Sequence, residues 1–312
     1  MSHDLRALPK VRDSWTYLYV EHCKIEQDMK SIALFDANGK TPIPCTMLSL
    51  LMLGPGTNIS HAAIRTLAEN GCLLTWVGEE GVRFYAQGMG ETRSSKRLLR
   101  QAYLCSNPNK RLEVVRHMYE IRFKEPIPLE WSLQQIRGRE GVRVREAYAQ
   151  ASRETGVAWT GRAYSREQWN KSDPVNRSLS SANSCLYGVC HAAIVAAGYS
   201  PALGFIHTGK MLSFVYDVAD LYKAEIAIPA AFAAAKNGSP DIERETRMAC
   251  RDLFRSSRLL QRIVDDLNSL MSVGGDWDPN DESTYDDDSA QPGKLWDENN
   301  EQVDGGTNFG ES

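Results

Sequence analysis

The pattern of hydrophobic and polar positions changes once along the chain, near residue 88. Before that point, short runs of β-branched, aromatic and aliphatic residues alternate with glycine, asparagine and aspartate, which is typical of strands joined by turns. Met47–Leu53 is apolar except for Ser49, which predicts a strand buried on both faces. A short helix should follow, starting after Asn58 or Ser60. The expected strands are Thr16–Val20, Ile32–Phe35, Met47–Leu53, Cys72–Val77 and Val82–Ala86.

Beyond residue 92 the apolar positions recur with the spacing of amphipathic helices. Proline and glycine separate the expected helices, which are Arg93–Cys105, Pro108–Lys124, Ser132–Thr155, Ser178–Ala197, Ser213–Ala235 and Asp241–Leu270. After Gly275 the sequence is acidic and aperiodic, as disordered segments are. We therefore predict an α+β protein. Its parts are a mostly β N-terminal domain at 1–87, a linker at 88–92, an all-α domain at 93–274 and a disordered acidic tail at 275–312.

Composition excludes several classes of protein. Of the 312 residues, 42% are hydrophobic, which is enough for a core. We expect no membrane span, because no run of about 18 apolar residues occurs, and no signal peptide, because the N-terminus lacks an apolar stretch. The seven cysteines form no Cys-x-x-Cys pair, which argues against a disulfide framework or a zinc finger and favours a cytoplasmic location.

The charge is distributed unevenly along the chain. The formal net charge is -4, but residues 276–312 hold twelve acidic residues and one basic residue, Lys294. That tail therefore carries -11, which leaves +7 on the rest of the chain. A basic body with an acidic tail is consistent with a protein that binds a polyanion.

Arginines recur with helical spacing in the last expected helix. They would form one stripe, opposite an apolar face, on a single helix that spans Asp241–Leu270. Arginine grips phosphate oxygens with two donors at once, so the stripe predicts contact with nucleic acid; a solvated helix surface is the alternative. The residues of this stripe are Arg244, Arg247, Arg251, Arg255, Arg258 and Arg262.

Further basic residues lie between 93 and 145, among them Arg137, and two aromatic residues, Tyr164 and Trp169, follow them. Exposed aromatic side chains among basic ones suit unpaired nucleotides, whose bases stack on the rings. Ordinary packing in the core is the alternative for both aromatic residues.

Four ionisable residues stand at positions that ordinary patterning does not explain. Glu140 falls in the apolar stripe of its helix, and Asp217 and Asp220 are three residues apart beside an apolar face. His207 lies between glycines, which predicts a tight loop that presents the imidazole. Carboxylates with one imidazole suit Mg²⁺ or Mn²⁺ better than structural zinc. Simple alternatives remain open: Glu140 could pair with Arg143, either aspartate with Lys210 or Lys223, and His207 could close a loop.

The strings around these residues resemble the CRISPR-associated integrase, protein one of the adaptation module, and most closely its type I-E branch. The resemblance covers roughly residues 5–270 in the same order. The strings are Gln134–Gly141, Gly204–Lys210 and Ser213–Asp220, with further similarity in Gly78–Arg83 and Ala249–Ser257.

The resemblance implies a β-domain joined to an α-helical catalytic domain, and an Mg²⁺ or Mn²⁺ site with ligands Glu140, His207 and Asp220. It places Asp217 near the metal as a fourth catalytic residue. Together with the basic stretches, it gives a set of expected DNA contacts: Arg83, Arg137, Tyr164, Trp169, Tyr187, Lys210, Arg244, Arg247 and Arg251.

The reaction implied by the resemblance is the insertion of short DNA fragments into a repeat array. The 3′-hydroxyl of a double-stranded fragment with single-stranded 3′ ends attacks a phosphodiester of CRISPR repeat DNA. The family forms homodimers that flank a small ferredoxin-like partner, protein two of the module. A structure-selective nuclease, with water as the nucleophile, and a non-catalytic DNA-binding scaffold are the alternatives. The Asp-rich tail departs from the often Pro-rich tail of the branch.

Overall fold

The computed structural model describes residues 17–45, 48, 50–79, 83–88, 95–162, 173–274, 295–296 and 302–303. It divides into two compact units, one of Pro9–Pro279 and one that combines Met1–Leu8 with Asn280–Ser312. In the second unit the described residues are the strands β9 (Leu295–Trp296) and β10 (Gln302–Val303), which pair antiparallel. The prediction of a disordered tail did not include this pair, and the rest of the tail lies outside the described residues.

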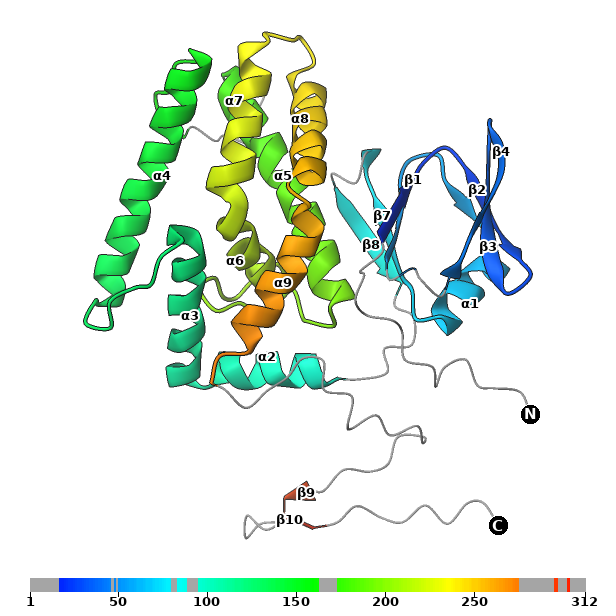
Figure 1. The fold of residues 1–312 in the computed structure, drawn as a ribbon, viewed down its shortest axis with the longest axis horizontal. Coiled ribbons are helices and arrows are strands. Elements are labelled where there is room, and N and C mark those ends of the chain that lie inside the picture. The colour runs from blue at the N-terminus through cyan, green and yellow to red at the C-terminus, as the bar shows by residue number, and fades with distance from the viewer. Residues whose placement is uncertain are drawn as a thin grey trace. The chain divides into compact units, whose positions relative to one another are not determined.

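Two four-stranded sheets form the N-terminal part of the larger unit (Figure 1). In the first sheet, three parallel strands are followed by an antiparallel edge strand; the order is β1 (Tyr17–Val20), β5 (Leu50–Leu53), β7 (Leu73–Val77) and β8 (Phe84–Gly88). The second sheet has the order β4 (Gly39–Ile43), β3 (Ser31–Asp36), β2 (Lys24–Asp28) and β6 (Asn58–Ile59). The helix α1 (His61–Glu69) follows β6 and is capped by Ser60, one of the two candidate starts that the sequence offered.

The strand β5 is buried on both faces and so joins two hydrophobic cores. Leu50 and Met52 pack into the large core of the helical part, whereas Leu51 and Leu53 pack into the core around α1. Alternation of side chains across a strand sends neighbouring residues to opposite faces. The prediction of a doubly buried strand is therefore confirmed.

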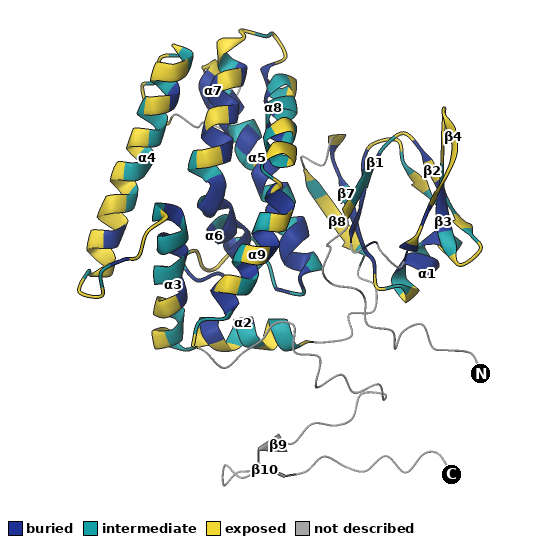
Figure 2. Ribbon diagram, in the orientation of Figure 1, coloured by how far each residue is buried: buried dark blue, intermediate teal, exposed yellow. Residues whose placement is uncertain are grey.

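The C-terminal part of the larger unit is helical, which confirms the α+β class (Figure 1). Its elements are α2 (Lys96–Ser106), α3 (Pro108–Phe123), α4 (Leu133–Thr155), α5 (Pro174–Ala196), α6 (Ser213–Tyr222), the π-helical turn η4 (Lys223–Ala227), α7 (Ile228–Lys236), α8 (Ile242–Ser256) and α9 (Leu259–Met271). Figure 2 shows that α5 and α7 are mostly buried, whereas α4 exposes much of its surface. Of the linker predicted at 88–92, Gly88 ends β8 and residues 89–92 lie outside the described residues. The large core includes residues from before and after this stretch, so the division into two domains stays a prediction.

Two expected helices are interrupted. The prediction of one helix at Ser213–Ala235 was wrong, because a π-helical turn separates α6 from α7. Pro229 lacks the N–H that would bond to the carbonyl of Glu225, which favours the wider turn. The prediction of one helix at Asp241–Leu270 was also wrong, because Arg258 has a left-handed backbone (φ 48°) between α8 and α9. The arginine stripe is therefore divided between two helices.

The helix α5 is long and apolar enough, by length and composition, to cross a membrane. However, 61% of its apolar stretch is buried inside the fold, and the core helix of a soluble protein passes the same test. It packs against α6, α7, α8 and α9, and this burial accounts for its apolar character.

Candidate active site

Asp217 of α6 holds the preceding loop in place. Its Oδ2 accepts hydrogen bonds from the backbone N–H groups of Phe205 (2.6 Å) and Ile206 (3.0 Å). Its Oδ1 accepts from the backbone N–H of His207 (2.9 Å) and lies 2.7 Å from Nδ1 of the same residue. The carboxylate is 0% exposed, so these bonds replace its lost hydration. Asp217 thus folds the loop around its own side chain.

Glycine is required at the start of this loop. A Cβ on Gly204 would overlap the carbonyl oxygen of His207 and approach Cβ of Ser213 to 2.8 Å. Gly209 has open space around it but a left-handed φ of +80°, which glycine adopts without a steric cost. The two glycines therefore serve different needs, one of space and one of backbone conformation.

His207 is oriented by Asp217 and remains partly exposed. When Nδ1–H donates to the carboxylate, Nε2 is left as the acceptor of the ring, which is how carboxylates orient imidazole ligands of metals. The hydrogen bond to Asp217 raises the pKa of His207, with smaller contributions from the charges of Asp217 and Asp220, against a lowering by burial. The ring also meets Tyr216 edge-on at a centroid distance of 5.9 Å.

Glu140 of α4 and Asp220 of α6 face the same buried guanidinium, that of Arg122 on α3. The distances are 3.5 Å from Nη1 to Glu140 Oε1 and 3.6 Å from Nη2 to Asp220 Oδ2. Glu140 also accepts two hydrogen bonds from Arg143, at 2.8 and 2.9 Å. The three helices thus bring two carboxylates, distant in sequence, to one position.

Lys223 adds a second cation beside Asp220, with Nζ 2.5 Å from Oδ1. Burial works to lower the pKa of Lys223, but the charge of Asp220, then that of Tyr187 and hydrogen bonds to both residues outweigh it, so the pKa is raised. Nζ lies 5.3 Å from the centre of the Tyr187 ring, which in turn meets Tyr216 edge-on. Because Lys223 begins the π-helical turn, this turn sets the direction of its side chain.

The donor atoms suit a hard divalent cation, although the site is not closed around one. Within the described ranges, no group of three His, Cys, Asp or Glu side chains is spaced to hold a metal ion. Even so, the carboxylates of Glu140 and Asp220 come from different helices and face the same cation, Arg122. The charge of Asp220 also raises the pKa of His207, whose Nε2 is the ring atom that Asp217 does not engage. The chemistry of Glu140, His207 and Asp220 therefore fits Mg²⁺ or Mn²⁺.

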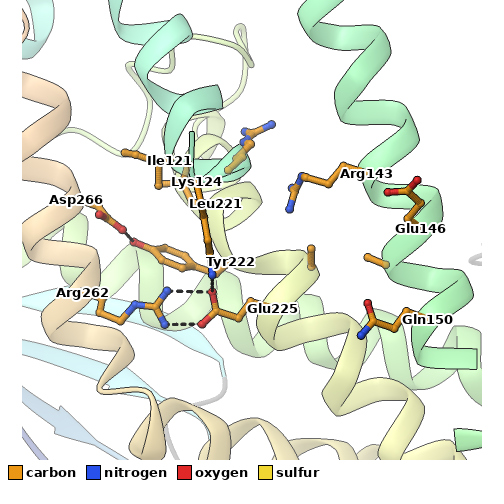
Figure 3. Close-up of a pocket in the computed structure, with 13 residues that line it drawn as sticks. Ile121, Lys124, Arg143, Glu146, Gln150, Leu221, Tyr222, Glu225, Arg262 and Asp266 are labelled. Atoms are coloured by element: carbon orange, nitrogen blue, oxygen red, sulfur yellow. Dashed lines mark hydrogen bonds and ion pairs between the residues drawn. The ribbon is translucent and has the colours of Figure 1, made fainter. Parts of the chain in front are cut away.

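A cavity of about 300 Å³ lies between α3, α4, α6, η4 and α9 (Figure 3). Arg122 and Arg143, the two arginines that contact Glu140, belong to its lining. Also in the lining, Arg262 of α9 donates two hydrogen bonds to Glu225, at 2.7 and 3.1 Å. On the same side, Tyr222 donates to Asp266 at 2.5 Å. The cavity therefore adjoins the carboxylate cluster and has a lining of paired charges.

The family model for the CRISPR associated protein Cas1 matches residues 16–129 and 122–251. The chain belongs to the Cas1 family. CRISPR-associated endonuclease Cas1 2 of Thermus thermophilus is 52% identical over 309 residues, which are 99% of this chain and 94% of the relative. CRISPR-associated endonuclease Cas1 of Escherichia coli is 45% identical over 265 residues, 85% of this chain and 87% of the relative. The family resemblance of the sequence is thus confirmed.

A solved structure of the family agrees with this fold. The crystal structure of the TtCas1–DNA complex superposes with a TM-score of 0.78 and 54% sequence identity, and the match covers 85% of this chain and 99% of that one. The relatives named above are endonucleases, so this chain is a member of a family of CRISPR-associated nucleases.

In this Cas1 family member, the predicted site residues fall into two groups. The first group consists of five residues that are linked by the contacts described above: Glu140, His207, Asp217, Asp220 and Tyr187. Two predicted DNA contacts lie on the same elements, since Lys210 is exposed on the loop after His207 and Arg137 is exposed one turn before Glu140 on α4.

The second group lies on α8 and at β8, on other elements. Arg247 donates to Glu79, which follows β7, at 3.4 Å, and Arg83, which precedes β8, is exposed. Arg251 donates to Asp252 at 3.1 Å, and Arg244 is exposed. Tyr164 and Trp169 lie outside the described residues.

Sequence reasoning missed the central role of Arg122. It stood among nine basic residues at 93–124, although its spacing from Val115, Met118 and Tyr119 places it on the apolar face of α3, a signal that was not used. Lys223 and Arg143 were named only as alternative partners of the acids, and the structure shows both ion pairs. The partners of Arg122, which are Glu140 and Asp220, are distant in sequence and are recognised only when the helices that carry them are placed.

Proposed function

We propose that this Cas1 family member is a metal-dependent DNA integrase of CRISPR adaptation. It joins the 3′-hydroxyl of a short DNA fragment to a phosphodiester of the repeat array, exchanging one phosphodiester for another. The observation that carries the proposal is the convergence of Glu140 and Asp220 on one position, with His207 oriented by Asp217. Such a set of oxygen and imidazole donors is used for phosphoryl chemistry with hard metal ions.

Each residue has a defined part in this proposal. Glu140, Asp220 and Nε2 of His207 hold the metal ion, and Asp217 keeps the imidazole in the orientation needed. When bound, Mg²⁺ or Mn²⁺ supplies Lewis-acid stabilisation of the charge that builds on the phosphoryl oxygens. Lys210 and Lys223 provide positive charge for the phosphates that enter the site.

The DNA substrate follows from the basic surface and from the relative solved with DNA. We assign phosphate contacts to Arg83, Arg137, Arg244, Arg247 and Arg251, and stacking on the fragment end to Tyr164, Trp169 and Tyr187. The working assembly is a homodimer that flanks the small ferredoxin-like partner. The fragment is double-stranded with single-stranded 3′ ends, and the target is CRISPR repeat DNA.

A strand-transfer assay tests the proposal. The purified protein and its partner are incubated with a labelled oligonucleotide and a supercoiled repeat plasmid, with Mg²⁺, with Mn²⁺ or with a chelator. We expect joined product only with metal, and a loss of at least about 100-fold for each of Glu140→Ala, His207→Ala and Asp220→Ala. Arg65→Ala, on the exposed surface of α1, is the matched control that keeps full joining.

The outcomes separate the candidate functions. The relatives named as endonucleases favour a structure-selective nuclease as the second candidate. Metal-dependent cleavage without joining supports the nuclease, whereas DNA binding without either reaction supports a scaffold. Full joining by all three alanine variants contradicts the assigned site.

A further inference from the structure

Among the cationic side chains described above at the candidate active site, Arg122 is the most deeply buried, with 4% of it exposed. Its two terminal nitrogens point to different carboxylates, at 3.5 Å from Glu140 and 3.6 Å from Asp220. Nη2 also donates to the backbone carbonyl of Asp217 at 3.4 Å, and the guanidinium lies 5.0 Å from the centre of the Tyr119 ring. One side chain therefore contacts all three acidic residues of the site.

These contacts differ from those of an ordinary structural ion pair. Both carboxylate distances exceed the 2.7–2.9 Å of a close charge-assisted hydrogen bond. Nε of Arg122 is buried and has no hydrogen-bond partner within the described part of the chain. A buried guanidinium with long contacts and an unused donor costs folding energy. Arg122 therefore faces two carboxylates at once, and neither ion pair has the short distance of a close one.

The other two cations of the cluster behave differently. Arg143 binds Glu140 with two short bonds and is 25% exposed, and Lys223 binds Asp220 and is 32% exposed. Each serves a single carboxylate and has a long side chain that reaches solvent. Arg122 alone among these three faces both carboxylates, and its fork-shaped guanidinium can face two acceptors where a lysine presents one point charge.

We propose that Arg122 is a resident counter-cation of the metal site, an inference that rests on the proposed function. It holds Glu140 and Asp220 close together before metal is bound, and its fixed charge opposes the incoming divalent ion. The site is therefore tuned to weaker metal binding than its carboxylates alone would give. Arg122 is a positioning residue, because it acts on the metal through its ligands.

The sign of its effect on metal affinity follows from the charges. Without Arg122 the two carboxylates repel each other, which destabilises the metal-free protein. A divalent ion then meets two carboxylates with one positive charge fewer beside them. A positive charge about 4 Å from a divalent ion changes the affinity for that ion by more than tenfold, even at an effective dielectric constant of about 20. We therefore expect the loss of this repulsion to outweigh the loss of the ordering that Arg122 gives to the two carboxylates. Replacing Arg122 therefore weakens the metal-free fold and strengthens metal binding.

Metal titration of the full-length protein tests the inference without any assay of activity. Mn²⁺ binding is measured by calorimetry, and the melting temperature is measured in chelator and in Mn²⁺. For Arg122→Met we expect a lower melting temperature in chelator, a larger rise on adding Mn²⁺, and a dissociation constant smaller by about tenfold or more. Arg143→Met, which removes a cation from one carboxylate only, is the matched control and changes all three quantities less.

Two further variants keep the inference falsifiable. Arg122→Gln keeps donors without charge and should also tighten Mn²⁺ binding, so it replaces the methionine variant if that one does not fold. Arg122→Lys keeps the charge and should bind Mn²⁺ within about threefold of the wild type. Equal or weaker Mn²⁺ binding by the uncharged variants overturns the role of Arg122. Failure of the wild type itself to bind Mn²⁺ overturns the metal site, and so contradicts the proposed function instead.

Discussion

Asp217 and Asp220 lie one turn apart on α6 and have opposite surroundings. Asp217 is fully buried and accepts four hydrogen bonds from the Phe205–His207 segment. Asp220 is 21% exposed and, within the described part of the chain, is held by two cationic side chains, the buried Arg122 and the partly exposed Lys223. Backbone donors cannot leave a carboxylate without unfolding the loop, whereas the partly exposed side chain of Lys223 can turn away from Asp220 while the helices stay in place. The first aspartate is therefore committed to structure, and the second is available to a ligand.

This difference shows how one short helix serves two purposes. The periodicity of α6 places both acids beside its apolar side, so their spacing alone does not distinguish them. What separates them is the element that each one meets, a tight loop for Asp217 and the side chains of α3 and η4 for Asp220. The predictions below test this division, beginning with the largest effect.

The largest effect is expected from Asp217→Asn. The amide cannot accept four hydrogen bonds from N–H donors, and its own NH₂ group would face them. We expect the free energy of unfolding to fall by about 3 kcal/mol or more, measured by denaturant titration. Asp220→Asn is the matched control and should cost about 1 kcal/mol, while it abolishes the stabilisation by Mn²⁺. Equal losses of stability in the two variants would contradict the division.

A smaller loss is expected when the loop held by Asp217 is crowded. Gly204→Ala places a Cβ against the carbonyl oxygen of His207, so the loop must shift. We expect a loss of about 2 kcal/mol in the free energy of unfolding, with weaker Mn²⁺ binding because His207 moves. Gly209→Ala meets no neighbouring atom and should cost about 1 kcal/mol for its left-handed backbone, with Mn²⁺ binding unchanged. If Gly204→Ala left both quantities unchanged, the loop would not need its close packing.

The smallest effect concerns Glu225, an acid one turn further on that is held by exposed cations. The hydrogen bond from Arg262 lowers the pKa of Glu225, helped by the charges of Arg262 and Lys124, against a raising by burial. A lowered pKa contributes stability that is present above the ordinary glutamate pKa of about 4.3 and is lost as the pH falls through the folded-state value. Because Glu225 is 39% exposed, screening keeps this contribution under about 1 kcal/mol.

Denaturation of Glu225→Gln and the wild type between pH 7 and pH 3 measures this contribution. The wild type should be slightly more stable at pH 7, and the difference should vanish at the acid end. A difference that grew as the pH fell would show that the ion pair with Arg262 does not stabilise the fold.

Much of the fold follows from local patterns in the sequence. The apolar run at β5 predicted a doubly buried strand, and Ser132 with Gln135 forms the capping box at the expected start of α4. The glycines around His207 correctly indicated a tight loop rather than a helix. Each of these features depends on residues close together in the chain, which is why pattern reasoning reaches them.

The features that sequence reasoning missed depend on distant contacts or on single backbone positions. The break at Arg258 has no glycine or proline to mark it, whereas Pro229 was a signal for the π-helical turn that was not used. The sequence singled out the four acidic and imidazole residues of the candidate site, but only the family resemblance, and not their spacing, set Asp217 apart from the three expected metal ligands. Only the packing of α3 against α6 shows that Asp217 is enclosed and that Arg122 stands between Glu140 and Asp220.

The π-helical turn at Lys223–Ala227 also bears on which changes of length this segment tolerates. A π-helical turn holds about one residue more than an α-helical turn, so losing one residue within it lets the turn close as an ordinary α-helix. Losing one residue between the turn and Phe232 would instead rotate the rest of α7 by about 100° and take the buried Phe232 out of the core that it shares with α5. Deletions of one residue should therefore be tolerated better within the π-helical turn than in the first residues of α7.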